Sequence, residues 1–538
     1  MLFKRKKKVV QQLQQSFGKL KDASFNFELI EKYFRNKDHA TSFQSLSDKT
    51  CNDLDFQELF MFIDRTSSKV GQQYLYNELR TIPADSSKVE LNEKLIKELS
   101  NNGLRIDTQQ LLLQLQKDDV YYIPSLFQEE HLKPPMWFFV VRLLSFTSLL
   151  SLILLPFNAS LLFVLIGVFL VNMGIHYWNK KNLYRYLGSI PQLLRLNNVA
   201  QKLYKKGTFK EIDPDLPSSI KIIDQVKNRM SFFQLEAKLQ GDLEVLFWAV
   251  LEIVKIVFLL EPLLLFGVLK RLNTKREAIE KVFSFVGQID TLISIASLRD
   301  GVSDYCLPNI RENDNQILAE QAYHPLIINC VPNSIHVSDK SILLTGSNMS
   351  GKTSFIRTIG VNLITGLTLN TCFAKSMVIP RVRIYSAIRI SDDLMNDKSY
   401  YFEEVLTIKD MIEKSATGKS NLFLLDEIFK GTNTIERISA GKAVLSFLAN
   451  TNNLVFVSTH DIELTDMLSD NYALYHFSEI VTNKNVDFDY KLKEGKLENR
   501  NAIRILEIND YPKSIIKEAL EISGELDQKR EEHHHLMT

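Results

Sequence analysis

The chain has 538 residues, which is enough for two to four domains of ordinary size. Hydrophobic residues make up 45% of it and charged residues 24%, so the composition excludes disordered, collagen-like and disulfide-scaffold proteins. The 65 lysines and arginines against 64 aspartates and glutamates leave a net charge of +1. This balance argues against nucleic-acid binding over the whole surface but leaves a local basic face open. Four cysteines without CxxC spacing predict reduced thiols in a cytosolic body.

The N-terminus begins with a basic stretch, MLFKRKKKVV, which leads into polar residues rather than an apolar segment. It is therefore not predicted to be a cleavable signal sequence. Binding to anionic lipid headgroups and a solvated basic tail are both open interpretations. We expect residues 1–54 to form a basic helical segment and residues 55–133 to form a helical, core-like region.

Two apolar stretches follow at residues 137–155 and 159–178, and Arg142 is the only Asp, Glu, Lys or Arg within them. Each is about 20 residues long, enough for a helix to cross a hydrocarbon core of about 30 Å. The connection between them is too short to be a domain. Residues 134–180 are therefore predicted to form a transmembrane helical hairpin, with a buried core hairpin of a soluble protein as the alternative.

Positive side chains flank this hairpin at Lys133 and at Lys180 and Lys181, whereas the turn between its helices carries none. The positive-inside rule then places both flanks in the cytoplasm. Trp137 and Trp178 stand where interfacial anchors are expected. We therefore predict a multi-pass membrane protein with two spans, whose N-terminus and C-terminal domain are cytoplasmic.

Residues 181–300 have helical patterns with few glycines and are predicted to form a helical core or lever region. The apolar run at 243–269 contains four charged residues. We favour a buried or membrane-surface helix there over a third span, because an odd number of spans would separate the two ends of the chain. Clustered lysines and arginines over residues 179–240 fit DNA, lipid headgroups or a solvated helix face.

From about residue 320 onward, short β-rich runs alternate with helical ones. This alternation is typical of a parallel sheet with helical crossovers. We expect an α/β domain over residues 301–515, preceded by the all-α region and followed by a helical tail at residues 516–538.

The segment from Gly346 to Thr353, GSNMSGKT, fits the P-loop pattern G-x-x-x-x-G-K-[ST] and lies between a strand-like and a helix-like run. Its two glycines allow backbone N–H groups to approach phosphate oxygens closely. Lys352 is expected to reach the β- and γ-phosphates of ATP, and the Thr353 hydroxyl to ligate Mg²⁺. The residues expected to contact the nucleotide are Gly346, Asn348, Met349, Ser350, Gly351, Lys352, Thr353 and Ser354.

Two further apolar runs, expected to be strands, are each followed by residues suited to catalysis. NLFLL is followed by Asp426 and Glu427, and NLVFVST is followed by His460. Asp426 suits the Mg²⁺ shell, and Glu427 suits orienting or deprotonating an attacking water. His460 is a candidate to hydrogen-bond the γ-phosphate or that water. The predicted catalytic residues are therefore Glu427, His460 and Lys352, and the predicted Mg²⁺ ligands are Thr353 and Asp426.

These motifs resemble the MutS family of DNA mismatch-repair ATPases, whose nucleotide domain is of the ABC type. TGSNMSGKTSFIRTIG resembles that family's P-loop, LLDEIFKGTNTIERISAG its DEIGRGTST segment, and STHDIELT its THY-x-EL segment. The run SYYFEE from Ser399 resembles a segment whose serine faces a nucleotide bound by the partner subunit. His324 lies in a segment that resembles the family's RHP segment. The resemblance covers residues 320–515 strongly, and 55–82 and 275–300 in fragments.

The resemblance implies a homodimer that binds ATP and Mg²⁺, with Ser399 acting in trans and His324 near the nucleotide. The family's mismatch-reading domain and DNA clamp have no counterpart that we recognise. Within the motifs, Ser347, Phe429 and Asn433 replace a proline, a glycine and a serine, which leaves the phosphate and Mg²⁺ ligands intact.

We therefore expect a membrane-anchored ATPase that works as a dimer, with mismatched DNA as a candidate ligand in DNA repair. The alternative hypothesis is a membrane-tethered ATPase that remodels or signals to a partner other than DNA. A transporter is a weaker third hypothesis, because two spans per chain leave little for a translocation path.

Overall fold

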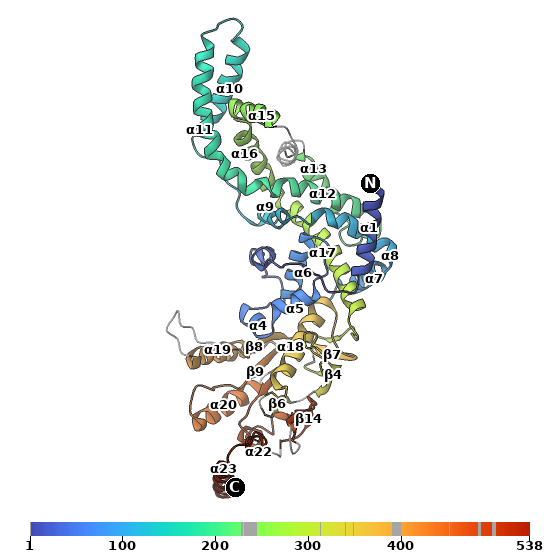
Figure 1. Cartoon of the computed structure of the whole chain (residues 1–538), viewed down its shortest axis with the longest axis vertical. Helices are drawn as coiled ribbons and strands as arrows, with labels where there is room; N and C mark the ends of the chain where they lie inside the picture. The colour runs from blue at the N-terminus through green and yellow to red at the C-terminus, as the bar shows by residue number, and fades with distance from the viewer. Residues whose placement is uncertain are drawn as a thin grey trace. The chain divides into compact units, whose positions relative to one another are not determined.

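A computed structural model describes residues 2–227, 230, 245–312, 314–338, 340–347, 349–389, 400–450, 452–481, 486–497 and 502–537 (Figure 1). The chain divides into two compact units. The helical unit comprises residues 1–41, 60–80 and 85–302, and the α/β unit comprises residues 42–59, 81–84 and 303–538.

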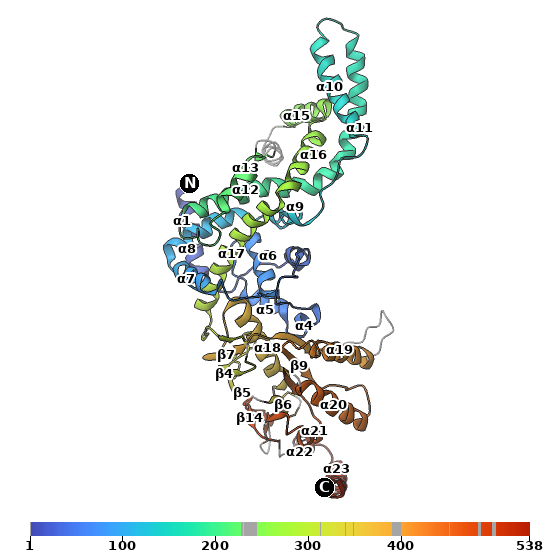
Figure 2. The same cartoon turned by 180° about the vertical axis from the view of Figure 1, so that it is seen from behind.

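The helical unit is built almost wholly from α-helices, which Figures 1 and 2 show from opposite sides. Its helices are α1 (Leu2–Ser16), α2 (Phe27–Ile30), α3 (Lys32–Arg35), α6 (Lys69–Arg80), α7 (Val89–Leu99), α8 (Asn102–Leu112), α9 (Ser125–Gln128), α10 (Phe138–Leu154), α11 (Leu161–Leu187), α12 (Ser189–Lys205), α13 (Leu216–Asp224), α15 (Val245–Phe258), α16 (Leu260–Leu272) and α17 (Arg276–Gly301). Helix α5 (Phe56–Ile63) contains residues of both units.

The centre of the helical unit is the contact between α6 and α17, in which a buried carboxylate caps a helix. Asp290 of α17 accepts hydrogen bonds from the backbone N–H groups of Ser67 and Ser68, both at 2.8 Å, at the start of α6. A carboxylate there satisfies N–H groups that have no partner within the helix. A Cβ on Gly71 would lie 2.2 Å from Asp290 Oδ2. Glycine at position 71 therefore lets the two helices approach closely.

Helices α10 and α11 form an antiparallel pair that extends beyond α15 in Figures 1 and 2. The pair carries large apolar side chains on its outside, such as Phe139, Phe146 and Phe163, which are 68%, 62% and 78% exposed. Buried side chains of the pair include the polar Ser148 and Asn172, besides Phe138 and Val141 near the start of α10. This distribution is the reverse of that in a water-soluble helical pair, where the apolar side chains face inward.

Two of the described segments are long and apolar enough to cross a membrane. The apolar 18-residue window within Leu161–Lys180 has a mean hydropathy of 1.9 and is 11% buried, whereas that within Leu260–Gly301 has a mean hydropathy of 1.2 and is 83% buried. The first lies within α11, and its partner α10 is a shorter apolar helix. The second includes α17 and lies mostly inside the helical unit, as a core segment does. Helix α11 continues past the predicted end at Trp178 as far as Leu187.

The apolar run at 243–269 does not form one long helix. Its described part forms α15 and α16, which meet at Leu259 in a left-handed conformation with φ of 47°. Helix α16 is largely buried, and Ser145 of α10 donates a 2.8 Å hydrogen bond to the Phe258 carbonyl at this corner. The favoured interpretation of a single buried or membrane-surface helix is therefore corrected to a helical corner that packs against the hairpin.

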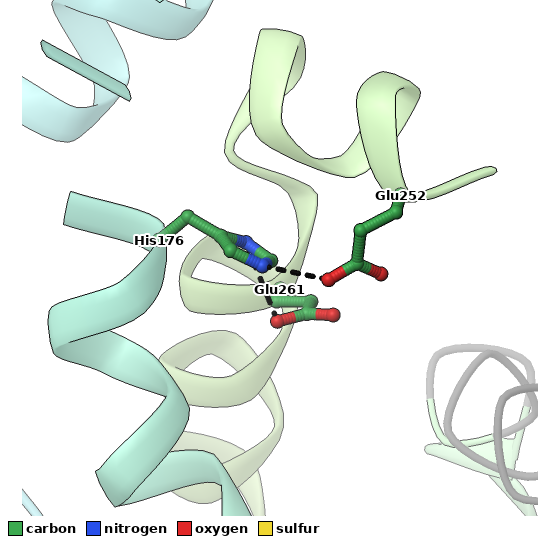
Figure 3. Close-up of side chains that lie close together, drawn as sticks. All are labelled: His176, Glu252 and Glu261. Carbon is green, nitrogen blue, oxygen red and sulfur yellow. Dashed lines mark hydrogen bonds and ion pairs between the residues drawn. The ribbon is translucent and has the colours of Figure 1, made fainter. Parts of the chain in front are cut away.

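Buried charged groups join α11, α15 and α16 (Figure 3). His176 Nε2 lies 3.0 Å from Glu252 Oε1, and His176 Nδ1 lies 3.5 Å from Glu261 Oε2. Lys180 contacts Glu252 at 2.6 Å, and Lys255 contacts both glutamates at 3.0 Å. Such a histidine and two carboxylates can hold a metal ion. Here two lysine ammonium groups already balance both carboxylates, so we regard the cluster as ionic cross-links between three helices.

The α/β unit contains two main sheets. Its helices are α4 (Asp48–Asp53), α18 (Lys352–Leu369), α19 (Tyr400–Ser415), α20 (Thr434–Ala449), α21 (Glu463–Met467), α22 (Ala502–Ile508) and α23 (Lys513–Met537). Its strands are β1 (Gln44–Ser45), β2 (Thr81–Ile82), β3 (Asn309–Arg311), β4 (Ile317–Ala322), β5 (Asn333–Val337), β6 (Ser341–Thr345), β7 (Ser376–Pro380), β8 (Arg383–Ala387), β9 (Asn421–Asp426), β10 (Asn453–Ser458), β11 (Tyr472–His476), β12 (Glu479–Val481), β13 (Val486–Phe488) and β14 (Lys493–Glu494).

The larger sheet has the strand order β14-β11-β6-β10-β9-β8 and is parallel except at β14. The smaller sheet, β3-β7-β4-β5, is mixed. Phe423 and Leu425 of β9 join a core cluster with residues of α19 and α20. The intervening Leu424 points to the opposite face of the sheet, towards α18. A Cβ on Gly360 of α18 would lie 2.6 Å from Leu424 Cδ1. Helices therefore cover both faces of the sheet, as expected for an α/β domain.

The first 54 residues are divided between the two units, whereas the sequence predicted one helical segment over residues 1–54. Residues 42–54 belong to the α/β unit rather than to one N-terminal helical segment. The Gln44 side chain exchanges two 2.8 Å hydrogen bonds with the backbone of Ile384, and Asp53 accepts one from the Ser386 hydroxyl at 2.6 Å. These partners are more than 300 positions away, so the local sequence pattern carries no sign of them.

Candidate nucleotide-binding site

The P-loop follows β6 and leads into α18, as its sequence context predicts. Gly346 and Gly351 have φ of 146° and 109°, which are conformations that favour glycine. A Cβ on Gly346 would lie 2.6 Å from the Phe477 carbonyl oxygen and 2.9 Å from Ser350 Oγ. Glycine is therefore needed at position 346 for two reasons: the backbone conformation disfavours other residues, and the neighbouring atoms leave no room for a Cβ.

Lys352 is the first residue of α18, and its side chain turns back over the loop. Its Nζ donates hydrogen bonds to the carbonyl oxygens of Gly346 at 2.9 Å and Ser347 at 3.0 Å, and it lies 3.5 Å from His460 Nε2. Burial lowers the pKa of Lys352, while Glu427 and Asp426 act in the opposite direction. A buried ammonium group held over the loop is suited to binding phosphate oxygens.

Thr353 and Asp426 meet across the edge of the sheet. The Thr353 hydroxyl donates a 2.8 Å hydrogen bond to Asp426 Oδ2, and the Ser458 hydroxyl bonds to Asp426 Oδ1. Strands β6, β9 and β10 are parallel neighbours, so their carboxyl ends lie at one edge. A hydroxyl and a carboxylate are oxygen ligands of the kind that Mg²⁺ prefers. The two predicted Mg²⁺ ligands are therefore adjacent.

Glu427 lies next to Asp426, and its carboxylate contacts a histidine and a lysine side chain. His460 Nε2 is 2.6 Å from Glu427 Oε1, and Lys430 Nζ is 2.7 Å from Glu427 Oε2. Burial alone would raise the pKa of Glu427, but hydrogen bonds from His460 and Lys430 outweigh it and lower the pKa to about 2. The carboxylate is therefore ionised at neutral pH and is able to orient a water molecule.

A cavity of about 430 Å³ opens beside these groups. Its lining includes P-loop residues, among them Lys352 and Thr353, together with Glu427. It also includes a more apolar group, Ile327, Ile328, Cys330, Phe477 and Tyr490. A cavity that combines phosphate-binding groups with apolar side chains fits the chemistry of a nucleotide.

A buried polar atom in the P-loop gives an independent test of whether a nucleotide fits. Ser350 is 1% exposed, and its Oγ has no hydrogen-bond partner within the described residues. Buried hydroxyl groups are normally satisfied, so an orphaned one at this position is consistent with a missing acceptor such as a phosphate oxygen. With the glycine geometry and the buried lysine, the residues present fit ATP and Mg²⁺.

The structure brings together most of the predicted site residues. One loop and one sheet edge hold eight of them: Gly346, Ser350, Gly351, Lys352, Thr353, Asp426, Glu427 and His460. Two more, Met349 and Ser354, line the cavity. Asn348 and Ser399 lie outside the described residues. His324 is buried and does not line the cavity. Its Nδ1 accepts a 3.3 Å hydrogen bond from the N–H of Leu326, just before residues 327–331, which do line the cavity. The role of His324 in nucleotide contact stays a prediction.

Sequence reasoning missed several residues that the fold brings to the site. Lys430 contacts Glu427, and Ser458 contacts Asp426. Tyr490 enters the cavity lining from far along the chain. Lys430 stands three residues after Glu427, and Ser458 ends a strand, so inspection of positions near the motifs could have found these two. Nothing in the local sequence marks Tyr490.

Residues 342–527 match the family model described as MutS domain V. A DNA mismatch repair protein MutS from Petrotoga mobilis is 32% identical over 275 residues, which cover 49% of this chain and 33% of that protein. MutS proteins from Listeria monocytogenes and Aquifex pyrophilus are each 28% identical over 265 and 259 residues, covering 47% and 46% of this chain and 30% of each relative. The chain spans about a third of the length of these relatives. The chain is thus similar to MutS proteins over about half of its length, and to MutS domain V over residues 342–527.

Proposed function

We propose that the chain is a membrane-anchored, MutS-like ATPase that binds and hydrolyses ATP with Mg²⁺. The observation that carries this proposal is the convergence of Lys352, Thr353, Asp426, Glu427 and His460 at the carboxyl edge of three parallel strands. Open α/β sheets bind their ligands at this edge. The match to MutS domain V covers the same residues and supports the assignment.

The chemistry proposed for the site is mostly positioning and charge neutralisation. The P-loop amides and Lys352 hold the phosphate oxygens, and Thr353 and Asp426 hold the ion. Mg²⁺ supplies further neutralisation of phosphate charge when bound. Glu427 orients the attacking water, and His460, which contacts both Glu427 and Lys352, hydrogen-bonds the γ-phosphate or that water.

Nucleotide binding by the purified 538-residue chain in detergent tests this proposal. We expect a fluorescent ATP analogue to bind the natural chain and to bind Lys352→Ala at least about tenfold more weakly, because the substitution removes the buried ammonium group. Lys340→Ala is the matched control, since that lysine donates to the Ser469 carbonyl at 2.8 Å and does not line the cavity. Equal affinity of all three proteins would contradict the proposal.

The proposed location is the membrane, with α10 and α11 as two spans and both flanks in the cytoplasm. The reversed distribution of side chains on this pair supports it, because apolar groups face outward while Ser148 and Asn172 face inward. Trp137 and Trp178, whose ring centroids are 4.9 Å apart, lie together at the base of the pair. Tryptophan is enriched at the membrane interface.

The proposed assembly is a homodimer in which Ser399 of one chain approaches the nucleotide of the other, and the proposed ligand is DNA. The proposal of DNA rests on similarity to relatives that are named for DNA mismatch repair. The proposal of a dimer rests on the resemblance of the segment from Ser399 to that of the MutS family. Binding to matched and mismatched duplexes, measured at several salt concentrations with and without ATP, tests the choice of ligand. A DNA-binding chain loses affinity steeply with salt, because phosphate contacts release counterions. No binding at low salt would favour a partner other than DNA.

A further inference from the structure

The loop that follows β9 has an unusual backbone conformation at the site of the proposed catalytic carboxylate. Glu427 and Phe429 have φ of 50° and 62°, in the left-handed region that residues with a side chain rarely adopt. Two such residues so close together cost free energy, and they persist only where the surroundings hold them. Something outside the loop must therefore fix this conformation.

The first turns of α19 supply that support. Glu404 is fully buried, and its Oε1 accepts a 2.5 Å hydrogen bond from the backbone N–H of Phe429. Tyr401, one turn earlier, lies so close to the loop that a Cβ on Gly431 would be 2.8 Å from its Cβ. The rings of Tyr401 and Phe429 are 6.3 Å apart between centroids. Helix α19 thus contacts the loop on both sides of Lys430.

The other end of the loop is attached to the sheet. The backbone N–H of Glu427 donates a 2.9 Å hydrogen bond to the Ser458 carbonyl, while the Glu427 side chain reaches His460 and Lys430. The loop therefore has two anchors, the sheet before Ile428 and α19 after it. The two left-handed residues, Glu427 and Phe429, are the residues whose N–H groups make these two contacts, so the loop conformation is held at both of them.

We infer that Glu404 is a positioning residue for ATP hydrolysis, which holds the loop from Glu427 to Gly431 so that the Glu427 carboxylate stays beside His460. The inference rests on the proposed ATPase function and adds a residue that does not itself reach the nucleotide cavity. Burial raises the pKa of Glu404. A neutral carboxyl group keeps an oxygen that can accept from the Phe429 N–H, so the role depends on an acceptor at that position rather than on charge.

Steady-state hydrolysis and nucleotide affinity of Glu404 variants test the inference on the full chain in detergent. Glu404→Ala removes the acceptor, and we expect kcat to fall at least about tenfold while the Kd of a fluorescent ATP analogue changes less than about twofold. Glu404→Gln retains an acceptor oxygen in the same place, and we expect at least about one third of natural kcat. Glu413→Ala is the matched control, a glutamate exposed near the far end of the same helix, and should leave kcat unchanged.

A second variant keeps the test decisive if Glu404→Ala does not fold. Gly431→Ala places a Cβ against Tyr401 and should push the loop off α19, with the same loss of kcat and unchanged nucleotide affinity. The inference is overturned if Gly431→Ala or a folded Glu404→Ala hydrolyses ATP at the natural rate, or if Glu404→Gln is as impaired as Glu404→Ala. If the natural chain hydrolyses ATP and these variants do so at the same rate, the inference fails but the proposed function stands. A natural chain without any ATP hydrolysis overturns both.

Discussion

The Thr353 hydroxyl donates a 2.8 Å hydrogen bond to Oδ2 of Asp426, although the two residues are 73 positions apart in the chain. Thr353 is the second residue of α18, the helix after the P-loop, and Asp426 is the last residue of β9. The contact depends on the parallel alignment of β6, β10 and β9, which brings their carboxyl ends together. It places the two proposed Mg²⁺ ligands in direct contact.

Asp426→Asn should weaken the dependence of hydrolysis on Mg²⁺. The amide removes the negative charge and one of the oxygens, so we expect the Mg²⁺ concentration for half-maximal activity to rise at least about tenfold. Titration of ATPase activity with Mg²⁺ measures this. Ser458→Ala removes a hydrogen bond to the same carboxylate but no proposed ligand, and should shift the titration less. An unchanged titration in Asp426→Asn would remove this residue from the Mg²⁺ site.

His324 should make the stability of the α/β unit fall in acid. Burial lowers the pKa of His324 to about 4, below the value of about 6.5 in an unfolded chain. Since the unfolded state binds the proton more tightly, this stabilising contribution is complete above pH 6.5 and is lost as the pH falls towards 4. The expected loss between pH 7 and pH 4.5 is about 2–3 kcal/mol. His324→Asn should show a smaller loss in urea unfolding, and parallel pH profiles would refute the assignment.

Gly71→Ala should destabilise the helical unit. A methyl group there would lie 2.2 Å from Asp290 Oδ2 and 2.5 Å from its Cβ, so α6 and α17 would have to separate. We expect a loss of about 2–3 kcal/mol, as for other overpacked cores. Gly103→Ala in α8 is the control, because the nearest atom to its Cβ, Asn101 Oδ1, would be 3.9 Å away. Thermal unfolding followed by circular dichroism compares the two, and equal stabilities would argue against this packing.

The outer half of the hairpin should determine membrane attachment. Ser148 and Asn172 face each other, with Asn172 Nδ2 3.4 Å from Ser148 Oγ. A short Gly-Ser linker in place of residues 149–171 can therefore join α10 to α11 and keep the contacts with α15 and α16. We expect the natural chain to stay with membranes after carbonate extraction and the shortened chain to enter the soluble fraction. A natural chain already in the soluble fraction would contradict the two proposed spans.

Much of the site was predictable from the sequence because each motif is continuous and ends a strand. The P-loop, the Asp426–Glu427 pair and His460 are short runs with their own local patterns, and parallel strands then place them together. The support for the site was not predictable in the same way. Gln44, Glu404 and Tyr490 reach their partners from distant segments, and pairing across such distances leaves no local signature.

The hairpin shows a related difference between pattern and packing. Its apolar composition predicted two helices, but the burial of Ser148 and Asn172 and the corner at Leu259 depend on tertiary contacts. Composition gives Leu161–Lys180 the higher mean hydropathy, 1.9 against 1.2 for Leu260–Gly301. Exposure separates them further, because 11% of the apolar 18-residue window in the first and 83% of that in the second is buried.

The most direct test of the ATPase assignment is hydrolysis by Glu427→Gln. The substitution removes the carboxylate that is proposed to orient water but leaves Lys352, Thr353 and Asp426 in place, so binding should persist while turnover falls. We expect the variant to bind a fluorescent ATP analogue within about threefold of natural affinity and to hydrolyse ATP at least about one hundredfold more slowly, in the range found when single catalytic groups are removed. Steady-state turnover equal to that of the natural chain would contradict the account.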